Sequence, residues 1–182
     1  RCRQNAERAW VLDRLTLIQA DFRHFELPQP AGLIALPYHS LGHLLSLDDK
    51  REAIAHVFSQ LRPGGRFIFD VFSPDPRYLT RDPEELLPVA YYDDPAGSGK
   101  MLVNELYSYD KAAQVSRITW HYRREKDGRT VKKTLNLRCF FPEELLALVH
   151  YNGFRVLSRY GDFDRRKFTG ASSKQVLVCA PR

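Results

Sequence analysis

The sequence contains 182 residues, with 28 Lys and Arg against 22 Asp and Glu, and a formal net charge of +6. Its hydrophobic content of 43% and aromatic content of 12% exclude a disordered or fibrous chain. It has no apolar stretch of about 18 residues and no charged and then apolar leader, so we expect neither a membrane span nor a signal peptide. A chain of this length is expected to form one domain, or one domain with an elaboration.

The cysteines and the single methionine give two further expectations. Cys2, Cys139 and Cys179 are odd in number and form no CxxC pair. This pattern is typical of reduced, mostly buried thiols in a cytoplasmic protein, with no metal bound to them. The only methionine is Met101 and the sequence begins with Arg1, so we expect the complete gene product to contain residues before Arg1.

The positive charge is concentrated in one segment. Residues 1–91 carry 11 basic and 12 acidic side chains, whereas residues 92–182 carry 17 and 10. Residues 117–138 alone hold eight basic and two acidic side chains. Because the positive charge is local, it favours a surface that binds a small anion, or a sheet edge protected by charge. An electrostatic field around the whole molecule, which would attract a polyanion such as nucleic acid, is less expected.

The first part of the sequence alternates between β-type and helical segments. Its β-type segments are continuously apolar, which is typical of strands covered on both faces, as in a parallel sheet with helices on either side. The helix has Asp48 as its expected N-cap, and Pro63-Gly64-Gly65 is expected to end it. This order predicts a doubly wound α/β domain. We expect the end of a helix at 1–12, strands at 15–19, 32–36 and 66–72, and a helix at 48–61.

The middle of the sequence predicts an antiparallel sheet. A connection rich in Pro and Asp, with a short helix expected near 83–87, precedes it. With Asp127-Gly128 as a two-residue turn, Trp120 lies opposite Leu135 and Ile118 lies opposite Leu137, so both strands have one apolar and one polar face. The strands are expected at 101–109, 115–125 and 130–140, with polar pairs Thr119–Asn136, His121–Thr134 and Arg117–Arg138 on the other face.

The last part of the sequence predicts a helix and a hairpin. Pro142 at the first turn, acidic residues after it and Gly153 at the end are typical of a helix over 142–153. Two strands at 154–160 and 175–180 are joined by a polar link, which predicts a long hairpin.

Candidate ligand-binding residues follow the expected strands of the first part. In an open α/β sheet, ligands bind at the carboxyl ends of the parallel strands. Asp21 and Phe22 follow the first of these strands, and Tyr38, His39 and Ser40 follow the second. A carboxylate, an aromatic ring and a Tyr/His/Ser cluster suit a small-molecule crevice, without naming the ligand.

Several segments in this order resemble a known family. They include a Leu-Arg-Pro-Gly-Gly turn between helix and strand, and a Tyr-His-Ser-Leu-Gly-His segment after the second strand. Together, over nearly the whole chain, they resemble class I S-adenosylmethionine-dependent methyltransferases. The segments are Leu17-Ile-Gln-Ala-Asp-Phe22, Leu36-Pro-Tyr-His-Ser-Leu-Gly-His-Leu44, Leu61-Arg-Pro-Gly-Gly-Arg-Phe-Ile-Phe-Asp-Val-Phe72, Arg138-Cys-Phe-Phe-Pro-Glu-Glu-Leu145 and Asn152-Gly-Phe154.

The resemblance implies a Rossmann-like α/β fold with a mostly parallel sheet and a C-terminal β-hairpin. Residues 1–73 would form part of the cofactor-binding core, and residues 142–182 would complete its sheet. Residues 74–141 would form an inserted antiparallel sheet that serves as a lid or as a homodimer contact. The family's first strand, its Gly-rich turn and the acidic residue that follows have no counterpart here, so the fold is expected to be N-terminally truncated.

The resemblance also implies S-adenosylmethionine as cofactor and methyl transfer by in-line displacement. Asp21 would accept a hydrogen bond from the adenine amino group, because an ionised carboxylate is an acceptor only, and Phe22 would border the adenine. Pro37 and Tyr38 would lie beside the cofactor, with Tyr38 between cofactor and substrate. The alternatives are a capping aspartate and an ordinary aromatic residue at the rim.

The candidates for acid–base and substrate-binding roles lie in two segments. Tyr38, His39 and His43 are the catalytic candidates, since a base is needed only for a protonated amine or a hydroxyl acceptor. Ser40 could orient the substrate or cap a helix. Asp70, inside a buried strand, is interpreted as a polar anchor at the end of the sheet or as a side chain that points out at its edge, rather than as a catalytic residue. On the hairpin, Arg117, His121 and Arg138 could bind a carboxylate or phosphate, or could belong to a solvated face.

Three functions compete. The favoured one is methyl transfer to a small-molecule acceptor, which the cationic hairpin would suit if the acceptor is an anion. The second is a nucleic-acid-binding methyltransferase, in which aromatic residues of the hairpin stack bases; Leu36 departs from the acidic or Asn residue of the enzymes that methylate base amino groups. The third is a non-catalytic or partner-dependent fragment.

Overall fold

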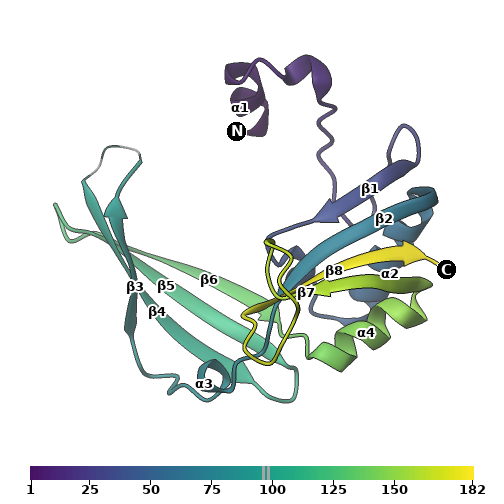
Figure 1. Cartoon of the computed structure of the whole chain (residues 1–182). Helices are drawn as coiled ribbons and strands as arrows, with labels where there is room; N and C mark the ends of the chain where they lie inside the picture. Colours follow the sequence, from purple (N-terminus) through teal and green to yellow (C-terminus); the bar gives the residue numbers. More distant parts are fainter. Residues whose placement is uncertain (96, 98) are drawn as a thin grey trace.

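The chain folds around two four-stranded β-sheets (Figure 1). The computed structural model describes residues 1–95, 97 and 99–182. One sheet has the order β1-β2-β8-β7, and the other has the order β3-β4-β5-β6. The elements are α1 (Cys2–Arg8), η1 (Leu12–Arg14), β1 (Ala31–Leu36), η2 (Ser40–His43), α2 (Leu47–Ser59), β2 (Leu61–Phe72), α3 (Pro76–Leu79), β3 (Leu87–Asp93), β4 (Lys100–Asp110), β5 (Val115–Arg124), β6 (Thr130–Arg138), α4 (Pro142–Tyr151), β7 (Phe154–Tyr160) and β8 (Lys174–Pro181).

The first sheet is mixed. β1 and β2 are parallel, and they are joined through η2 and α2. β8 lies between β2 and β7 and is antiparallel to both. The predicted C-terminal hairpin is therefore present, whereas only one pairing among the described strands of this sheet is parallel.

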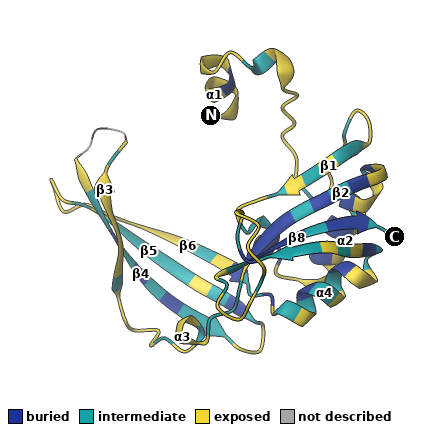
Figure 2. Ribbon diagram, viewed as in Figure 1, coloured by how far each residue is buried: buried dark blue, intermediate teal, exposed yellow. Residues whose placement is uncertain are grey.

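Both long helices pack on the same face of the mixed sheet. Ile54 of α2 and Leu145 of α4 are buried in one cluster with Phe67 and Phe69 of β2. Figure 2 shows the buried residues of this sheet concentrated in its middle strands, β2 and β8. The sequence predicts helices on both faces, but Leu33, on the opposite face of β1, is 56% exposed. In this sheet, therefore, strands with continuous apolar runs have helices on one face only.

The predicted first strand, at 15–19, is not formed. These residues have no regular secondary structure, and Leu15, Leu17 and Ile18 are 45%, 36% and 47% exposed. A β-strand exists only when a neighbouring strand satisfies its backbone groups. β1, which is at the edge of the mixed sheet, pairs with β2 alone among the described strands.

Three local boundaries differ from the prediction. The N-cap of α2 is Ser46, whose hydroxyl accepts a hydrogen bond from the Asp49 N–H at 3.0 Å, rather than Asp48. β2 begins at Leu61 and includes the Pro-Gly-Gly segment, where its register with β1 is irregular. The helix expected near 83–87 is absent, because this stretch is a turn that leads into β3, and the short helix α3 lies earlier, with Asp75 as its N-cap.

The second sheet confirms the three predicted antiparallel strands but corrects their register. Ile118 pairs with Leu135, and Trp120 pairs with Lys133, which is a shift of two residues from the expected pairing. The connection covers residues 125–129, and Gly128 takes a positive φ of 69° within it. Longer hairpin loops of this kind are built around a turn followed by a left-handed residue. A shift of two leaves every side chain on its predicted face.

The centre of one face of the second sheet is a buried ion pair. Arg81 Nη1 lies 3.0 Å from Oε1 of Glu105, and their side chains are 10% and 9% exposed. The indole N–H of Trp120 donates to the other carboxylate oxygen of Glu105 at 2.9 Å. The guanidinium also lies over the rings of Tyr78 and Tyr107.

None of the helices in the described ranges is long and apolar enough to cross a bilayer.

Candidate functional site

A strained turn follows the carboxyl end of β1. Tyr38 and His39 have φ values of 61° and 57°, in the left-handed region that costs about 1–2 kcal/mol for a residue other than glycine. The Ser40 hydroxyl donates to the Pro37 carbonyl at 2.5 Å and closes the turn. Leu41, which follows the turn, is 1% exposed and anchors the turn in the apolar core.

The same turn is packed against the second sheet. A Cβ added at Gly42 would lie 3.3 Å from Cδ2 of Leu137, on β6. The turn therefore lies where the mixed sheet and the second sheet meet. A side chain at this position would require Leu137 to shift by a few tenths of an ångström.

His39 and Asp70 form the central contact of the site. Asp70 alternates along β2 with Phe69 and Val71, which face the helices, so its carboxylate lies on the opposite face of the sheet. His39 Nδ1 lies 2.7 Å from Oδ2 of Asp70, which is 1% exposed. The contact lacks the alignment of a hydrogen bond, and no other described residue bonds to Nδ1 of His39 or to either carboxylate oxygen.

Two further residues surround the imidazole. The ring stacks on Phe72 with centroids 3.5 Å apart. Lys174, the β8 partner of Phe72, approaches the same group, and its ammonium lies 3.4 Å from Oδ1 of Asp162. Burial lowers the pKa of His39, the Asp70 carboxylate opposes this effect, and the Lys174 charge adds to it. His39 is therefore neutral near pH 7.

The other residues predicted in this turn are arranged around His39. Tyr38 points away from the core and is 87% exposed. His43 is exposed at the end of η2. The Ser40 hydroxyl is committed to the Pro37 carbonyl. The structure thus brings Pro37, Tyr38, His39, Ser40 and His43 together, with only the imidazole of His39 held against a buried charge.

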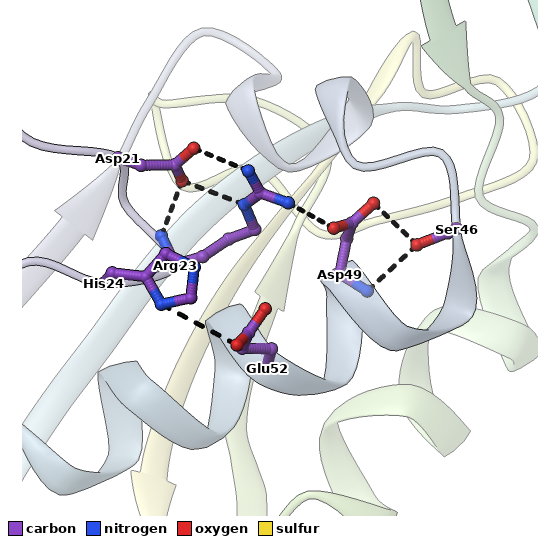
Figure 3. A network of polar contacts seen from close by, with 6 residues as sticks. All are labelled: Asp21, Arg23, His24, Ser46, Asp49 and Glu52. Atoms are coloured by element: carbon purple, nitrogen blue, oxygen red, sulfur yellow. Dashed lines mark hydrogen bonds and ion pairs between the residues drawn. The ribbon is translucent and has the colours of Figure 1, made fainter.

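Asp21 lies in a network that joins its loop to the start of α2 (Figure 3). The Arg23 side chain donates to both carboxylate oxygens of Asp21, at 3.0 and 2.8 Å, and also contacts Asp49. Arg23 holds the pKa of Asp21 well below its usual range, so the carboxylate is ionised. The side chain of Asp21 remains 46% exposed, and the neighbouring Phe22 packs against the core.

The three candidates on the second sheet have different surroundings. Arg117 is 57% exposed and donates to Asp110 at 2.9 Å. His121 is half-buried on the same face of β5, and its Nε2 is buried without a hydrogen-bond partner among the described residues. Arg138 is 10% exposed, and its guanidinium contacts Gln114 and Glu144, so it joins β6 to α4.

Sequence reasoning singled out Asp70 as a residue inside a buried strand but did not foresee its contact with His39. A lone acidic residue within a continuously apolar strand indicates a buried partner, because buried carboxylates are rare unless they are paired. The sequence alone does not predict that the turn after β1 brings His39 back over β2.

Two cavities lie away from this turn. One has a volume of about 380 Å³ on the outer side of α2, between Arg51, Glu52 and Asn152. The other, of about 200 Å³, is lined by Tyr91, Leu102, Arg123 and Glu125 of the second sheet. Neither includes a residue of the turn or Asp70.

Comparisons with known proteins give structural matches only. No protein-family model matches the sequence, and no curated protein matches it. The methyltransferase CcbJ of Streptomyces caelestis is 21% identical and superposes with a TM-score of 0.85, over 98% of this chain and 68% of CcbJ.

Two other matching structures contain a bound nucleoside. CalS10, an amino pentose methyltransferase of Micromonospora echinaspora with S-adenosylmethionine bound, is 16% identical, with a TM-score of 0.66 over 98% of this chain and 71% of that one. The glycopeptide N-methyltransferase MtfA, complexed with S-adenosylhomocysteine, is 23% identical, with a TM-score of 0.62 over 99% of this chain and 67% of that one.

Proposed function

We propose that this chain, which has the fold of the class I S-adenosylmethionine-dependent methyltransferases, is an enzyme that transfers a methyl group to a small-molecule acceptor. The observation that carries the proposal is the likeness to CcbJ, with a TM-score of 0.85 over 98% of the chain. CalS10 acts on an amino pentose and MtfA is a glycopeptide N-methyltransferase, which favours a small acceptor that carries an amine.

The residues around Asp21 fit the adenine part of S-adenosylmethionine. Arg23 keeps the Asp21 carboxylate ionised, and nearly half of the side chain is open to solvent. Such a carboxylate has acceptor sites beyond those that Arg23 occupies, and an adenine amino group is a donor. Phe22 offers an apolar surface beside it. When bound, the cofactor supplies an electrophilic methyl group on a positively charged sulfur.

The turn after β1 is the proposed acceptor side. Pro37 and Tyr38 border the cofactor, and the exposed Tyr38 ring is available to an acceptor. Ser40 holds the turn, and His39 and His43 present ring nitrogens. Orientation of the acceptor and exclusion of water are the main contributions of the protein to a displacement that already has a good leaving group.

The second sheet is proposed as an insertion over the acceptor, in residues 74–141, between a cofactor core at 1–73 and the closing segment at 142–182. Gly42 against Leu137 places this sheet beside the turn. Arg117 and His121 lie on its cationic face and would favour an acceptor with a carboxylate or phosphate. Its edge strands could also pair with a second copy of the chain, which would make a homodimer.

A nucleic-acid acceptor has less support. Arg117 and Arg138 are already paired with Asp110 and Glu144. A single small anion needs only one exposed guanidinium, such as that of Arg117, whereas a nucleic acid needs several free cations for its phosphates. Because each neutralised phosphate contributes to the salt dependence of binding, affinity for single-stranded RNA that falls steeply between 50 and about 200 mM salt would favour this alternative.

The proposal is tested by titrating S-adenosylhomocysteine into the full chain in a calorimeter. We expect binding, and a loss of about tenfold or more in affinity for Asp21→Asn, because a hydrogen bond to a charged group contributes about 1.5–3 kcal/mol. Asp13→Asn, at the exposed helix η1, is the matched control and should bind as tightly as the unmodified chain.

A second assay addresses the acceptor. Transfer of a labelled methyl group from S-adenosylmethionine to glucosamine and to glycylglycine is measured by mass spectrometry. A folded chain that releases no heat with S-adenosylhomocysteine would contradict the cofactor, and one that binds it but methylates neither amine would contradict the acceptor class.

A further inference from the structure

The carboxylate of Asp70 is buried in a mainly apolar strand. It is 1% exposed, neither of its oxygens accepts an aligned hydrogen bond from the described residues, and Nδ1 of His39 lies 2.7 Å from Oδ2. Burying a carboxylate without hydrogen bonds costs considerable desolvation free energy, which an apolar side chain at the same position would not cost. A buried charge of this kind at the carboxyl end of a parallel strand is therefore a sign of function.

The imidazole of His39 is the group that this carboxylate faces. Tyr38 and His39 have left-handed backbone angles in the turn that brings the His39 ring over β2, where the ring stacks on Phe72. Nδ1 faces Oδ2 of Asp70 at 2.7 Å. A carboxylate at Nδ1 favours the tautomer that carries its proton there, which leaves the lone pair on Nε2.

On this geometry, we infer that Asp70 is a positioning residue that makes His39 the proton acceptor in the methyl transfer proposed above, on which this inference rests. The acceptor N–H or O–H bond breaks, and its proton bonds to Nε2 of His39. The electron pair that this releases bonds to the methyl carbon, while the carbon–sulfur electrons remain on sulfur. The imidazolium then forms against Asp70 and later releases its proton to water.

The other charges near the ring agree with this role. Lys174 from β8 is the further charged group that acts on His39, and its ammonium is held by Asp162 from the preceding loop. With its pKa lowered by burial, the ring is neutral before the reaction and can accept a proton. Asp70 then stabilises the cation that forms.

The first test is a titration of the histidine rings by NMR in the full chain without cofactor or acceptor. We expect His39 to be the Nδ1–H tautomer at neutral pH. In Asp70→Asn, we expect the pKa of His39 to fall, because the anion that favours the imidazolium is gone, and the tautomer preference to be lost. Glu52→Gln, which alters the exposed contact between His24 and Glu52, is the matched control and should leave His39 unchanged.

The second test is the pH profile of methyl transfer to glucosamine. His39→Gln should lower kcat about 100-fold at pH 7 with little change in KM, as expected for loss of a general base. Asp70→Asn should lower kcat about tenfold and move the acidic limb of the profile to lower pH. A structural role for Asp70 would not move this limb.

Different results would overturn the inference about Asp70 and His39 and the proposed methyltransferase function. An unchanged His39 titration or an unchanged pH profile in folded Asp70→Asn would overturn the inference. If that variant does not fold, an Nε2–H tautomer in the unmodified chain, or full activity of His39→Gln, would overturn it instead. A chain that binds no S-adenosylhomocysteine would overturn the proposed function, while the NMR titration still decides whether Asp70 orients His39.

Discussion

The two sheets of this protein are stabilised in different ways. The mixed sheet packs α2 and α4 on one face through an apolar core that includes Phe67, Phe154 and Leu177, all 0–1% exposed. The second sheet has at its centre the buried pair of Arg81 and Glu105, with aromatic rings around it. An apolar core tolerates the loss of its members in proportion to volume, whereas a buried ion pair depends on both partners.

The difference also bears on function. The helix-covered face of the mixed sheet is mainly apolar, and its buried Gln175 donates a hydrogen bond to the Phe140 carbonyl. The only buried carboxylate of the described strands of this sheet, Asp70, lies on the other face. In the second sheet, the buried Glu105 already has two partners. Each oxygen of Glu105 thus accepts a hydrogen bond, whereas neither oxygen of Asp70 does, although Nε and Nη2 of Arg81 also have no hydrogen-bond partner among the described residues. A buried carboxylate without aligned hydrogen bonds calls for an explanation beyond packing.

The largest expected effect is in the core of the mixed sheet. Phe154→Ala should lower the free energy of unfolding by about 4 kcal/mol, because it leaves a cavity between Phe58 and Phe67. Urea denaturation followed by circular dichroism measures the change. Tyr151→Ala, at a residue 84% exposed on the adjacent helix, should change stability by less than about 0.5 kcal/mol. Similar losses for both variants would contradict the assignment of the core.

The next effect is in the centre of the second sheet. Glu105→Gln keeps an acceptor for the Trp120 indole but leaves Arg81 buried without a counter-charge, and should cost about 3 kcal/mol. The double variant Arg81→Met, Glu105→Gln should recover part of this loss, because neither charge is then buried. Denaturation of the single and double variants measures the coupling. A double variant that is less stable than Glu105→Gln would show that the guanidinium is stabilised by its aromatic neighbours instead.

A smaller effect is expected at the exposed ion pairs beside the mixed sheet. Arg23 lowers the pKa of Asp21, so the contact stabilises the fold above the unfolded pKa of about 3.9 and is lost as the pH falls through the lower pKa of the folded state. In Arg23→Met, NMR titration should show the pKa of Asp21 rising toward its usual value. Asp75, whose pKa is lowered mainly by Arg77 in the same spacing, should be unaffected, and a shift there would mean that the substitution disturbs the fold.

The smallest effect is a difference in the rates at which the cysteine thiols react, which reports how readily the structure opens around each of them. Burial raises the pKa of Cys139 to about 11 and that of Cys179 to about 12, whereas Cys2 is exposed. With an aromatic disulfide reagent at pH 8, Cys2 should react at once and the other two only as the structure opens. Cys179, in the centre of the mixed sheet, should be the slowest. Faster reaction of Cys179 than of Cys139 would reverse the order of local stability.

The sequence by itself determined much of this protein. The sequence predicted the strands β4, β5 and β6, and alternation of apolar and polar residues predicted the side-chain faces of β5 and β6, because that pattern depends only on strand geometry. Pro142 and Gly153 marked the ends of α4 in the same local way. The motifs around Tyr38 and Gly64 were sufficient for the resemblance to methyltransferases, and the fold agrees with it.

The tertiary structure decided what depends on partners distant in sequence. Residues 15–19 have a strand-like composition, yet they form no strand where no neighbour pairs with them. The hairpin register moved by two residues because the loop geometry, which alternation does not constrain, sets it. The pair of His39 and Asp70, 31 positions apart in sequence, arises only where a strained turn folds back over β2. Local patterns specify elements, whereas a site is made by the contacts between them.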